Sequence, residues 1–468
     1  MKKLSNVVLK EISYPIYSKA INPSVPSVKE LEERLHKCKI RMEDMGLSHL
    51  IVYGDREHFA NLMYLINFDP RFEEALLIIS LNQQKPLLLV GNEGEGHLGV
   101  SPLWNWGLLR YECYQTFSLM NQPRNKSRNL KCVFQEEGIG QKSRVGVVGW
   151  KYFSECEMMN ARYITDIPSY IADILRSLVS NRSLINATEI LISPVNGLRS
   201  SLSTYEISLF EYSNMLGADA MTKILSNFRT DVIDYDLIRY AQYTGYPLSC
   251  HMSIKSTGNL HYGLSSPTGD LIKKGNPCSI SIAYWGSNIC RAGWVAYDEK
   301  DLPSNAKGYI NDFVAPYFIA LREWFKNLKI GTKGGDLYRL IANMLPFEKF
   351  GVYLNPGHLI HYDEWISSPI YENSTVIIRS GMYIQADIIP RSTVFGSSRM
   401  EDGFVIADAA LREELSLKYP DVFLRCMARR HFMESIGFEL PEEILPLSDI
   451  AGIISPFFLN KDLVLSFI

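Results

Sequence analysis

The sequence predicts two domains, an α/β layer domain at the N-terminus and an α+β domain after it. The chain has 468 residues, which is long enough for two or three domains of ordinary size. Up to about residue 192, short apolar strands alternate with helical or loop-rich segments, a pattern typical of an α/β layer. Beyond residue 199, helical runs are interleaved with a hairpin and further strands, which indicates an α+β arrangement.

The N-terminal domain is expected to span residues 1–192 and to begin with an extended arm up to residue 27. A helix is predicted from Ser27, with apolar residues near helical spacing and Gly46 as its end. Four runs of apolar and β-branched residues are then predicted to be buried strands, at 49–55, 75–81, 85–91 and 144–150.

The second domain is expected to span residues 199–440, after a linker at 193–200. A long helix is predicted from Thr204, and shorter helices are predicted at 236–245, 306–327 and 335–345, with a hairpin at 278–297. The remaining tail, residues 441–468, is apolar and contains proline. We expect it to pack on the body of the protein or on a partner subunit rather than to form a domain.

Composition and charge exclude several classes of function. The formal net charge is −3, which gives no electrostatic case for binding nucleic acid or an anionic membrane surface. We find no apolar run long enough for a membrane span and no signal-peptide core. The eight cysteines show no CxxC spacing, which is typical of reduced thiols in a cytoplasmic protein. A glycine-rich GNEGEGHLG run is too isolated to indicate a dinucleotide cofactor.

One stretch, from Asn355 to Asp402, concentrates the residues suited to chemistry. Two histidines, His358 and His361, follow a Pro-Gly turn, and two acidic residues, Asp387 and Glu401, lie on or beside predicted strands. An imidazole followed by carboxylates on adjacent strands is the arrangement that hydrolytic sites use, with or without a metal ion.

The order of these motifs resembles a known superfamily. The sequence NPGH, a Gly-Met pair followed five residues later by an acid, and an Arg-x-Glu-Asp strand are similar to the pita-bread enzymes. That superfamily includes methionine aminopeptidase, prolidase, aminopeptidase P and creatinase. The resemblance implies a pita-bread domain over residues 199–440. It also implies a creatinase-type N-terminal domain, with a ribonuclease-H-like α/β layer, and a homodimer in which that domain contributes to the neighbouring subunit's site.

Most members of the superfamily hold two metal ions with five ligands, in the order Asp, Asp, His, Glu, Glu. By position, His358, Asp387 and Glu401 fall on the last three. Counting along the family hairpin from Gly275 places the first two at Ser281 and Ala292, and neither side chain can replace a carboxylate. The resemblance therefore predicts that the dinuclear metal site is lost and that no metal or other cofactor is bound.

Creatinase is the member that works without this metal site, and the resemblance to it implies roles for further residues of this chain. Its catalytic histidine corresponds to His261, with Tyr262 following as in prolidases. Its guanidinium-binding glutamate corresponds to Trp294, which argues against creatine itself as the substrate. Arg291 is a candidate to hold Asp387 and Glu401 together in place of the lost cations. The predicted catalytic residues are His261, His358, Asp387 and Glu401, and the predicted substrate contacts are Tyr262, His361, Asp363, Ser281, Arg291 and Trp294.

The sequence therefore favours a metal-independent, creatinase-like enzyme that acts on a labile C–N bond of a small molecule. Two alternatives remain open. A pita-bread domain can serve as a binding module, and a misaligned hairpin would restore an Xaa-Pro metallopeptidase. Structural roles are also open for individual residues, and His358 could be a buried core histidine without a catalytic role. Asp387 and Glu401 could equally be structural acids paired with Arg399 or Arg391.

Overall fold

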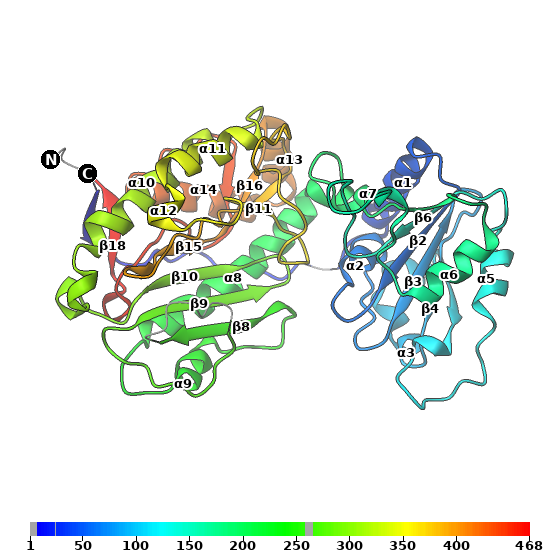
Figure 1. Cartoon of the computed structure of the whole chain (residues 1–468), viewed down its shortest axis with the longest axis horizontal. Coiled ribbons are helices and arrows are strands. Elements are labelled where there is room, and N and C mark those ends of the chain that lie inside the picture. Colours follow the sequence, from blue (N-terminus) through cyan, green and yellow to red (C-terminus); the bar gives the residue numbers. More distant parts are fainter. Residues whose placement is uncertain (1–6, 24, 258–264) are drawn as a thin grey trace. The chain divides into compact units, whose positions relative to one another are not determined.

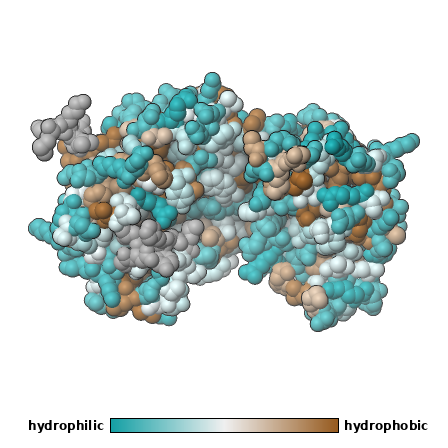
Figure 2. Space-filling view, viewed as in Figure 1, coloured by the Kyte–Doolittle hydropathy of each residue, from teal (hydrophilic) through white to brown (hydrophobic). Residues whose placement is uncertain are grey.

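The structure is a computed structural model that describes residues 7–23, 25–257 and 265–468 (Figure 1). The chain divides into two compact units. One unit is Ser24–Arg199, and the other contains Ser200–Ile468 together with the segment that precedes Ser24. Among the described helices, none combines the length and the apolar character that a membrane span requires. On the face in Figure 2, hydrophilic residues are interspersed with small groups of apolar ones.

The unit Ser24–Arg199 is built on one six-stranded sheet. The sheet is mixed, because β2 pairs antiparallel with β3 but parallel with β6. The central strands are buried along their whole length, as their continuous apolar sequences predict. In the order of the sheet, the strands are β5 (Arg110–Cys113), β4 (Leu87–Val90), β3 (Ala75–Ser80), β2 (His49–Gly54), β6 (Val145–Val148) and β7 (Leu184–Asn186).

Helices of the same unit pack against this sheet. Helix α1 begins where predicted, because the hydroxyl of Ser27 accepts a hydrogen bond from the backbone N–H of Glu30. Phe134 of α5 and Leu175 of α6 belong to one apolar cluster with residues of the strands. The helices are α1 (Val28–Asp44), α2 (Ala60–Ile66), α3 (Gly94–His97), α4 (Pro102–Asn105), α5 (Leu130–Glu136), α6 (Ser169–Leu178) and α7 (Glu189–Ile192).

The second unit contains two four-stranded antiparallel sheets. The first sheet has the order β15-β10-β9-β8 and the second β11-β12-β16-β17. Only Asp402 separates the end of β15 from the start of β16, so the chain passes directly from one sheet to the other there. The strands are β8 (Leu248–Ser256), β9 (Pro277–Tyr284), β10 (Ile289–Trp294), β15 (Arg399–Glu401), β11 (His358–Leu359), β12 (Tyr383–Gln385), β16 (Gly403–Ile406) and β17 (Ile444–Pro446), with a small hairpin of β13 (Arg391–Ser392) and β14 (Gly396–Ser397).

Seven α-helices of the described residues belong to this unit, and some differ from prediction. The helix predicted at 306–327 begins later, with a π-helical turn at Ile310–Val314, after Gly308 adopts a φ of +89°. The helix predicted at 236–245 is shorter and ends at Ile238. The helices are α8 (Thr204–Ser226), α9 (Asp234–Ile238), α10 (Ala315–Asn327), α11 (Gly334–Met344), α12 (Phe347–Phe350), α13 (Ala409–Lys418) and α14 (Pro420–Ser435).

Helices α13 and α14 were not predicted from the sequence, although both carry local signals. Asp408 caps α13 by accepting a hydrogen bond from the backbone N–H of Leu411. Pro420 occupies the first turn of α14, where its missing N–H costs nothing. Arg429 of α14 is buried in ion pairs with Glu211 and Asp449, so the two helices form part of the body of this unit.

The two ends of the chain pair with each other. Strand β1 (Val7–Glu11) runs antiparallel to β18 (Leu463–Phe467) along its whole length. The arm therefore belongs to the C-terminal unit, and the prediction that it opens the N-terminal domain is wrong. The tail packs on the body, as one of the two expectations had it, because β17 completes a sheet and Phe458 lies in the core with Ile224 and Ile280.

Candidate active site

His358 is held at the centre of the site by the turn before it. Gly357 has a φ of +113°, and a β-carbon on it would lie 2.9 Å from the ring of Trp324, so only glycine fits there. His358 then enters β11 and pairs with Gln385 of β12. The His358 side chain is fully buried, and its Nδ1 lies 3.2 Å from the carbonyl oxygen of Leu359. This contact leaves Nε2 facing the interior of the site.

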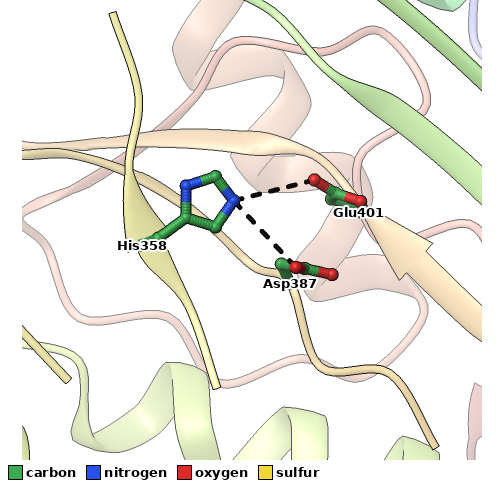
Figure 3. A group of neighbouring side chains, drawn as sticks. All are labelled: His358, Asp387 and Glu401. Carbon is green, nitrogen blue, oxygen red and sulfur yellow. Dashed lines mark ion pairs between the residues drawn. The ribbon is translucent and has the colours of Figure 1, made fainter. Parts of the chain in front are cut away.

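Three carboxyl groups surround Nε2 of His358. The distances are 3.8 Å to Glu364 Oε1, 4.0 Å to Asp387 Oδ2 and 3.9 Å to Glu401 Oε1. Figure 3 shows the imidazole directed at Asp387 and Glu401, which come from the segment after β12 and from β15. The cluster thus lies where the two sheets of this unit meet. The structure brings together three of the four residues predicted to be catalytic.

The site shifts the protonation equilibria of its members. Burial disfavours the imidazolium of His358, but the neighbouring carboxylates of Glu401, Glu364 and Asp387 outweigh it and raise its pKa to about 9. Burial and the charge of Glu401 raise the pKa of Asp387 to about 8. The imidazole beside Glu401 and the charge of Arg399 outweigh the burial of Glu401 and lower its pKa. At neutral pH the site therefore holds a charged imidazole, an ionised Glu401 and a protonated Asp387.

Asn288 is a member of the site that the sequence analysis missed. It lies in the turn between β9 and β10, and its Nδ2 donates hydrogen bonds to Glu401 Oε1 at 2.8 Å and to Glu364 Oε1 at 3.0 Å. Its Oδ1 accepts a hydrogen bond from Ser281 Oγ at 3.0 Å. Ser281, predicted to be a substrate contact, therefore supports the site through Asn288. An amide that donates hydrogen bonds to two carboxylates stabilises their ionised forms without adding a charge.

Two neighbours in the loop after β11 complete the surroundings of His358. The ring of Trp365 stacks on the imidazole, with centroids 4.0 Å apart and an interplanar angle of 19°. The side chain of Glu364 is 32% exposed, whereas Asp387 and Glu401 are buried, so Glu364 is the carboxyl group that reaches solvent. Of the acidic pair at 363 and 364, Glu364 faces His358. Asp363 is half-buried, and its carbonyl accepts a hydrogen bond from the backbone of His361.

Strand register shows where the two positions lie that the family resemblance aligns with aspartates. Ala292 lies opposite Arg399, and Cys290 lies opposite both Ser281 and Glu401. Because side chains alternate along a strand, all five lie on the same face of the sheet. The two positions that the resemblance aligns with metal ligands therefore lie on the site face. They hold a hydroxyl and a methyl group, and a guanidinium lies opposite the methyl group.

Arg291 does not hold Asp387 and Glu401 together, and that prediction is wrong. Its position between Cys290 and Ala292 turns it to the opposite face of the sheet. Its guanidinium pairs with Asp402 at 2.8 Å and donates to the carbonyls of Cys290 and Ile450. Arg291 is thus a core residue, and Arg399 is the arginine on the face of the site.

Two further predicted substrate contacts have structural partners instead. His361 is fully buried, pairs through Nε2 with Glu206 Oε1 at 3.0 Å and packs against Phe210. Glu206 also forms the capping box that begins α8, so this pair ties the site loop to the helix. Trp294 is buried against Tyr309, and its indole N–H donates to the carbonyl of Phe395. Neither side chain joins the cluster.

His261 and Tyr262, predicted to be a catalytic and a binding residue, lie outside the residues that the structure describes.

The residues present do not fit a dinuclear metal centre. A pair of ions needs carboxylates at positions 281 and 292, and the structure places Ser281 and Ala292 on the site face with Arg399 beside them. A positive guanidinium at that position also disfavours a second cation. A single ion is a different case, because ligand-capable atoms of His358, Asp387 and Glu401 all lie within 4.8 Å of one another.

Comparison with known proteins finds similarity in structure only. No family model matches the sequence, and no curated protein sequence matches it. The prolidase of Pyrococcus horikoshii OT3 matches with a TM-score of 0.60 at 13% identity, covering 80% of this chain and 95% of that chain. The Xaa-Pro dipeptidase of Bacillus anthracis matches with a TM-score of 0.59 at 13% identity, covering 81% and 96%. The N-terminal domain of the FACT complex subunit SPT16 from Cicer arietinum matches with a TM-score of 0.56 at 12% identity, covering 81% and 94%.

The chain has the pita-bread fold. The matches extend over both units, so the predicted fold class, a creatinase-type N-terminal domain followed by a pita-bread domain, is confirmed. At 12–13% sequence identity, structural similarity establishes the fold but not the reaction, which depends on the residues of the site.

Proposed function

We propose that this chain is a small-molecule hydrolase or lyase that cleaves a C–N or similarly labile bond by general acid–base catalysis, without a dinuclear metal centre. The observation that carries the proposal is a buried imidazole whose Nε2 lies 3.8–4.0 Å from three carboxyl groups. Ala292 and Arg399 occupy the place where a second metal ligand would lie. Such a constellation supplies both a proton donor and a proton acceptor.

Each member then has a distinct role. Glu364, the partly exposed carboxylate, takes a proton from water, and the resulting hydroxide attacks the electrophilic carbon. His358 donates the proton on Nε2 to the leaving nitrogen as the C–N bond breaks. Once substrate binding closes the 3.8 Å between Glu364 and Nε2 to hydrogen-bond distance, the proton taken up by Glu364 returns to Nε2 and resets the site. In a lyase, Glu364 would take the proton from the substrate carbon instead of from water.

Asp387 and Glu401 support the histidine. The ionised Glu401, held by Asn288, keeps His358 protonated, and Asp387 in its neutral form offers a hydrogen-bond donor. General acid–base catalysis contributes roughly 10²–10⁴-fold per group. That is modest for an unactivated peptide bond, so we expect a more labile substrate such as a guanidino, carbamoyl or imine-like compound.

The test combines metal analysis with an activity screen. The purified protein is incubated with Mn²⁺, Co²⁺ or Zn²⁺, desalted and analysed by elemental mass spectrometry. It is then assayed with and without EDTA against guanidino and carbamoyl acids and against Xaa-Pro dipeptides. We expect far less than one equivalent of metal and EDTA-insensitive turnover of a non-peptide substrate, lost in His358→Ala and strongly reduced in Glu364→Gln. Glu372→Gln, an exposed acid in the same loop region, is the matched control and should keep full activity.

A second candidate, a metallopeptidase with one ion, is favoured by the 4.8 Å cluster of His358, Asp387 and Glu401. Its signature would be a tightly bound equivalent of metal and metal-dependent hydrolysis of Xaa-Pro peptides, which would overturn the proposal. Failure of the whole substrate panel, metal-loaded or not, would instead favour a non-catalytic binding module. We also propose that the chain forms a homodimer, which light scattering would measure.

A further inference from the structure

Arg399 shares the site face of β15 with Glu401. The two residues are separated by one position on the strand, so their side chains project to the same side. Arg399 lies directly opposite Ala292 of β10, whose methyl group offers it no partner. The charge of Arg399 acts on the site, because it lowers the pKa of both Asp387 and Glu401.

Arg399 is buried and makes no hydrogen bond or ion pair within 4.0 Å among the residues that the structure describes. Its exposed fraction is 9%, and its Nε is sealed from solvent without a hydrogen-bond partner. The other buried arginines of the described chain all have partners on carboxylates, carbonyls or amides, namely Arg34, Arg199, Arg291, Arg425, Arg429 and Arg430. A buried guanidinium without a partner is costly, so Arg399 is poised for a group that the chain itself does not supply.

The acids near Arg399 act on it through their charge, but neither lies within ion-pair distance of its guanidinium. Glu401 Oε1 accepts from Asn288 and faces His358, and the nearest oxygen of Asp387 is directed to the same imidazole. The guanidinium keeps its planar set of N–H donors free, and that set matches the two oxygens of a carboxylate. A phosphate is disfavoured, because its second negative charge would lie close to three acidic side chains.

We propose that Arg399 binds a carboxylate group of the ligand, on the site face of the sheet where Ala292 lies opposite it. The proposal names the ligand class of the site described above and in that sense rests on the proposed function. It concerns binding alone, however, and would hold for a ligand that the protein does not convert.

The test measures binding of small carboxylates against their uncharged amides. Propionate and benzoate are titrated by calorimetry and compared with propionamide and benzamide at equal ionic strength, with inorganic phosphate as a further probe. We expect saturable binding of a carboxylate, no binding of its amide, and weaker binding of phosphate. Replacing Arg399 with Met should weaken carboxylate binding roughly ten- to hundredfold, as expected for the loss of charge-assisted hydrogen bonds.

A second variant makes the test independent of any damage caused by removing Arg399. Ala292→Asp places a carboxylate of the chain itself opposite Arg399. We expect it to occupy the guanidinium, to abolish binding of propionate and benzoate and to raise the melting temperature. Ala292→Asn has nearly the same volume but no charge. It is the matched control and should retain most of the binding.

Several outcomes would overturn the inference. Carboxylate binding that Arg399→Met leaves unchanged would do so, as would binding that Ala292→Asn abolishes as fully as Ala292→Asp. Amides that bind as tightly as the acids would also contradict it, and so would the absence of saturable binding by every carboxylate tested. Carboxylate binding without turnover would support Arg399 while contradicting the proposed enzyme. Turnover of uncharged substrates that Arg399→Met leaves unchanged would support the proposed enzyme while contradicting carboxylate binding by Arg399.

Discussion

Asn288 and Glu401 are joined by a hydrogen bond of 2.8 Å between the side-chain amide of one and the carboxylate of the other. The same amide donates to Glu364 at 3.0 Å, so a neutral donor lies between two acids inside the site. This contact supplies a hydrogen-bond donor to both carboxylates once they are taken out of water, and the imidazole of His358 adds a positive charge 3.8–3.9 Å away.

Replacing Asn288 with Asp should therefore destabilise the protein in the absence of metal. The change removes the shared donor and adds a like charge within hydrogen-bond distance of Glu364 and Glu401. The expected loss in the free energy of unfolding is about 1–3 kcal/mol, measured by urea denaturation in EDTA. Because the new carboxylate also adds a metal ligand, Mn²⁺ or Zn²⁺ should recover much of this loss.

Asn288→Ala separates these two effects. It removes the donor without adding charge, so we expect a loss of stability in EDTA that divalent metals do not reverse. If Asn288→Asp were as stable as the wild type in EDTA, the amide would not be what holds the two acids.

Much of this site can be predicted from the sequence, and the predictions that are wrong have identifiable physical causes. The structure brings His358, Asp387 and Glu401 together, as motif spacing predicted. It also places Ser281 and Ala292, which the family resemblance aligns with two aspartates, on the same face of the sheet as Glu401. The misassignment of Arg291 was avoidable. A residue next to Ala292 on a strand must point to the other face, and the same alternation places Arg399 beside Glu401.

Other features were beyond pattern reasoning. Asn288 lies in a turn and contacts a residue 113 positions away, a pairing that no local periodicity encodes. His361 follows His358 in the loop, yet the capping residue Glu206 of a distant helix draws it into the core. The arm at residues 7–11 was correctly predicted to be extended, but its pairing with the last strand depends on the fold of the whole unit.

The stability of the protein should fall as pH rises from neutrality to about pH 9. The folded-state pKa of His358 is raised from 6.5 to about 9, and that of Asp387 from 3.8 to about 8. Both shifts mean that the folded state binds more protons than the unfolded chain, so stability decreases with increasing pH. The contribution of His358 is complete below pH 6.5 and is lost through about pH 9. That of Asp387 is complete below pH 3.8 and is lost through about pH 8.

The measurement is the free energy of unfolding by urea at intervals between pH 6 and pH 9.5. We expect the wild type to lose a few kcal/mol over this range. His358→Gln should flatten the curve over the part of the range above pH 8. A wild-type protein whose stability rose with pH would show that His358 is neutral when folded.

Removing residues 1–23 should weaken the C-terminal unit and leave the other unit unchanged. The deletion strips β1 from β18 and exposes an unpaired edge strand. Hydrogen exchange followed by mass spectrometry should show faster exchange in Leu463–Phe467, with no change in the strands from His49 to Val90. Deleting residues 1–6 alone, which stops short of β1, is the control. Equal acceleration in both units would contradict the assignment of the arm.

Arg291 and Arg399 should respond to the same substitution with stability losses of different size. Arg291→Met leaves Asp402 buried without its partner, since the two are joined at 2.8 Å and are 3% and 0% exposed. We expect a loss of about 3–5 kcal/mol in the free energy of unfolding, partly recovered in the double variant Arg291→Met/Asp402→Asn. Arg399→Met removes a buried charge that makes no direct ion pair among the described residues but stabilises the ionised Glu401. We therefore expect a smaller loss of stability than Arg291→Met causes, together with the loss of carboxylate binding. A large loss of stability from Arg399→Met, with carboxylate binding retained, would show that Arg399 has a structural role and does not bind the ligand.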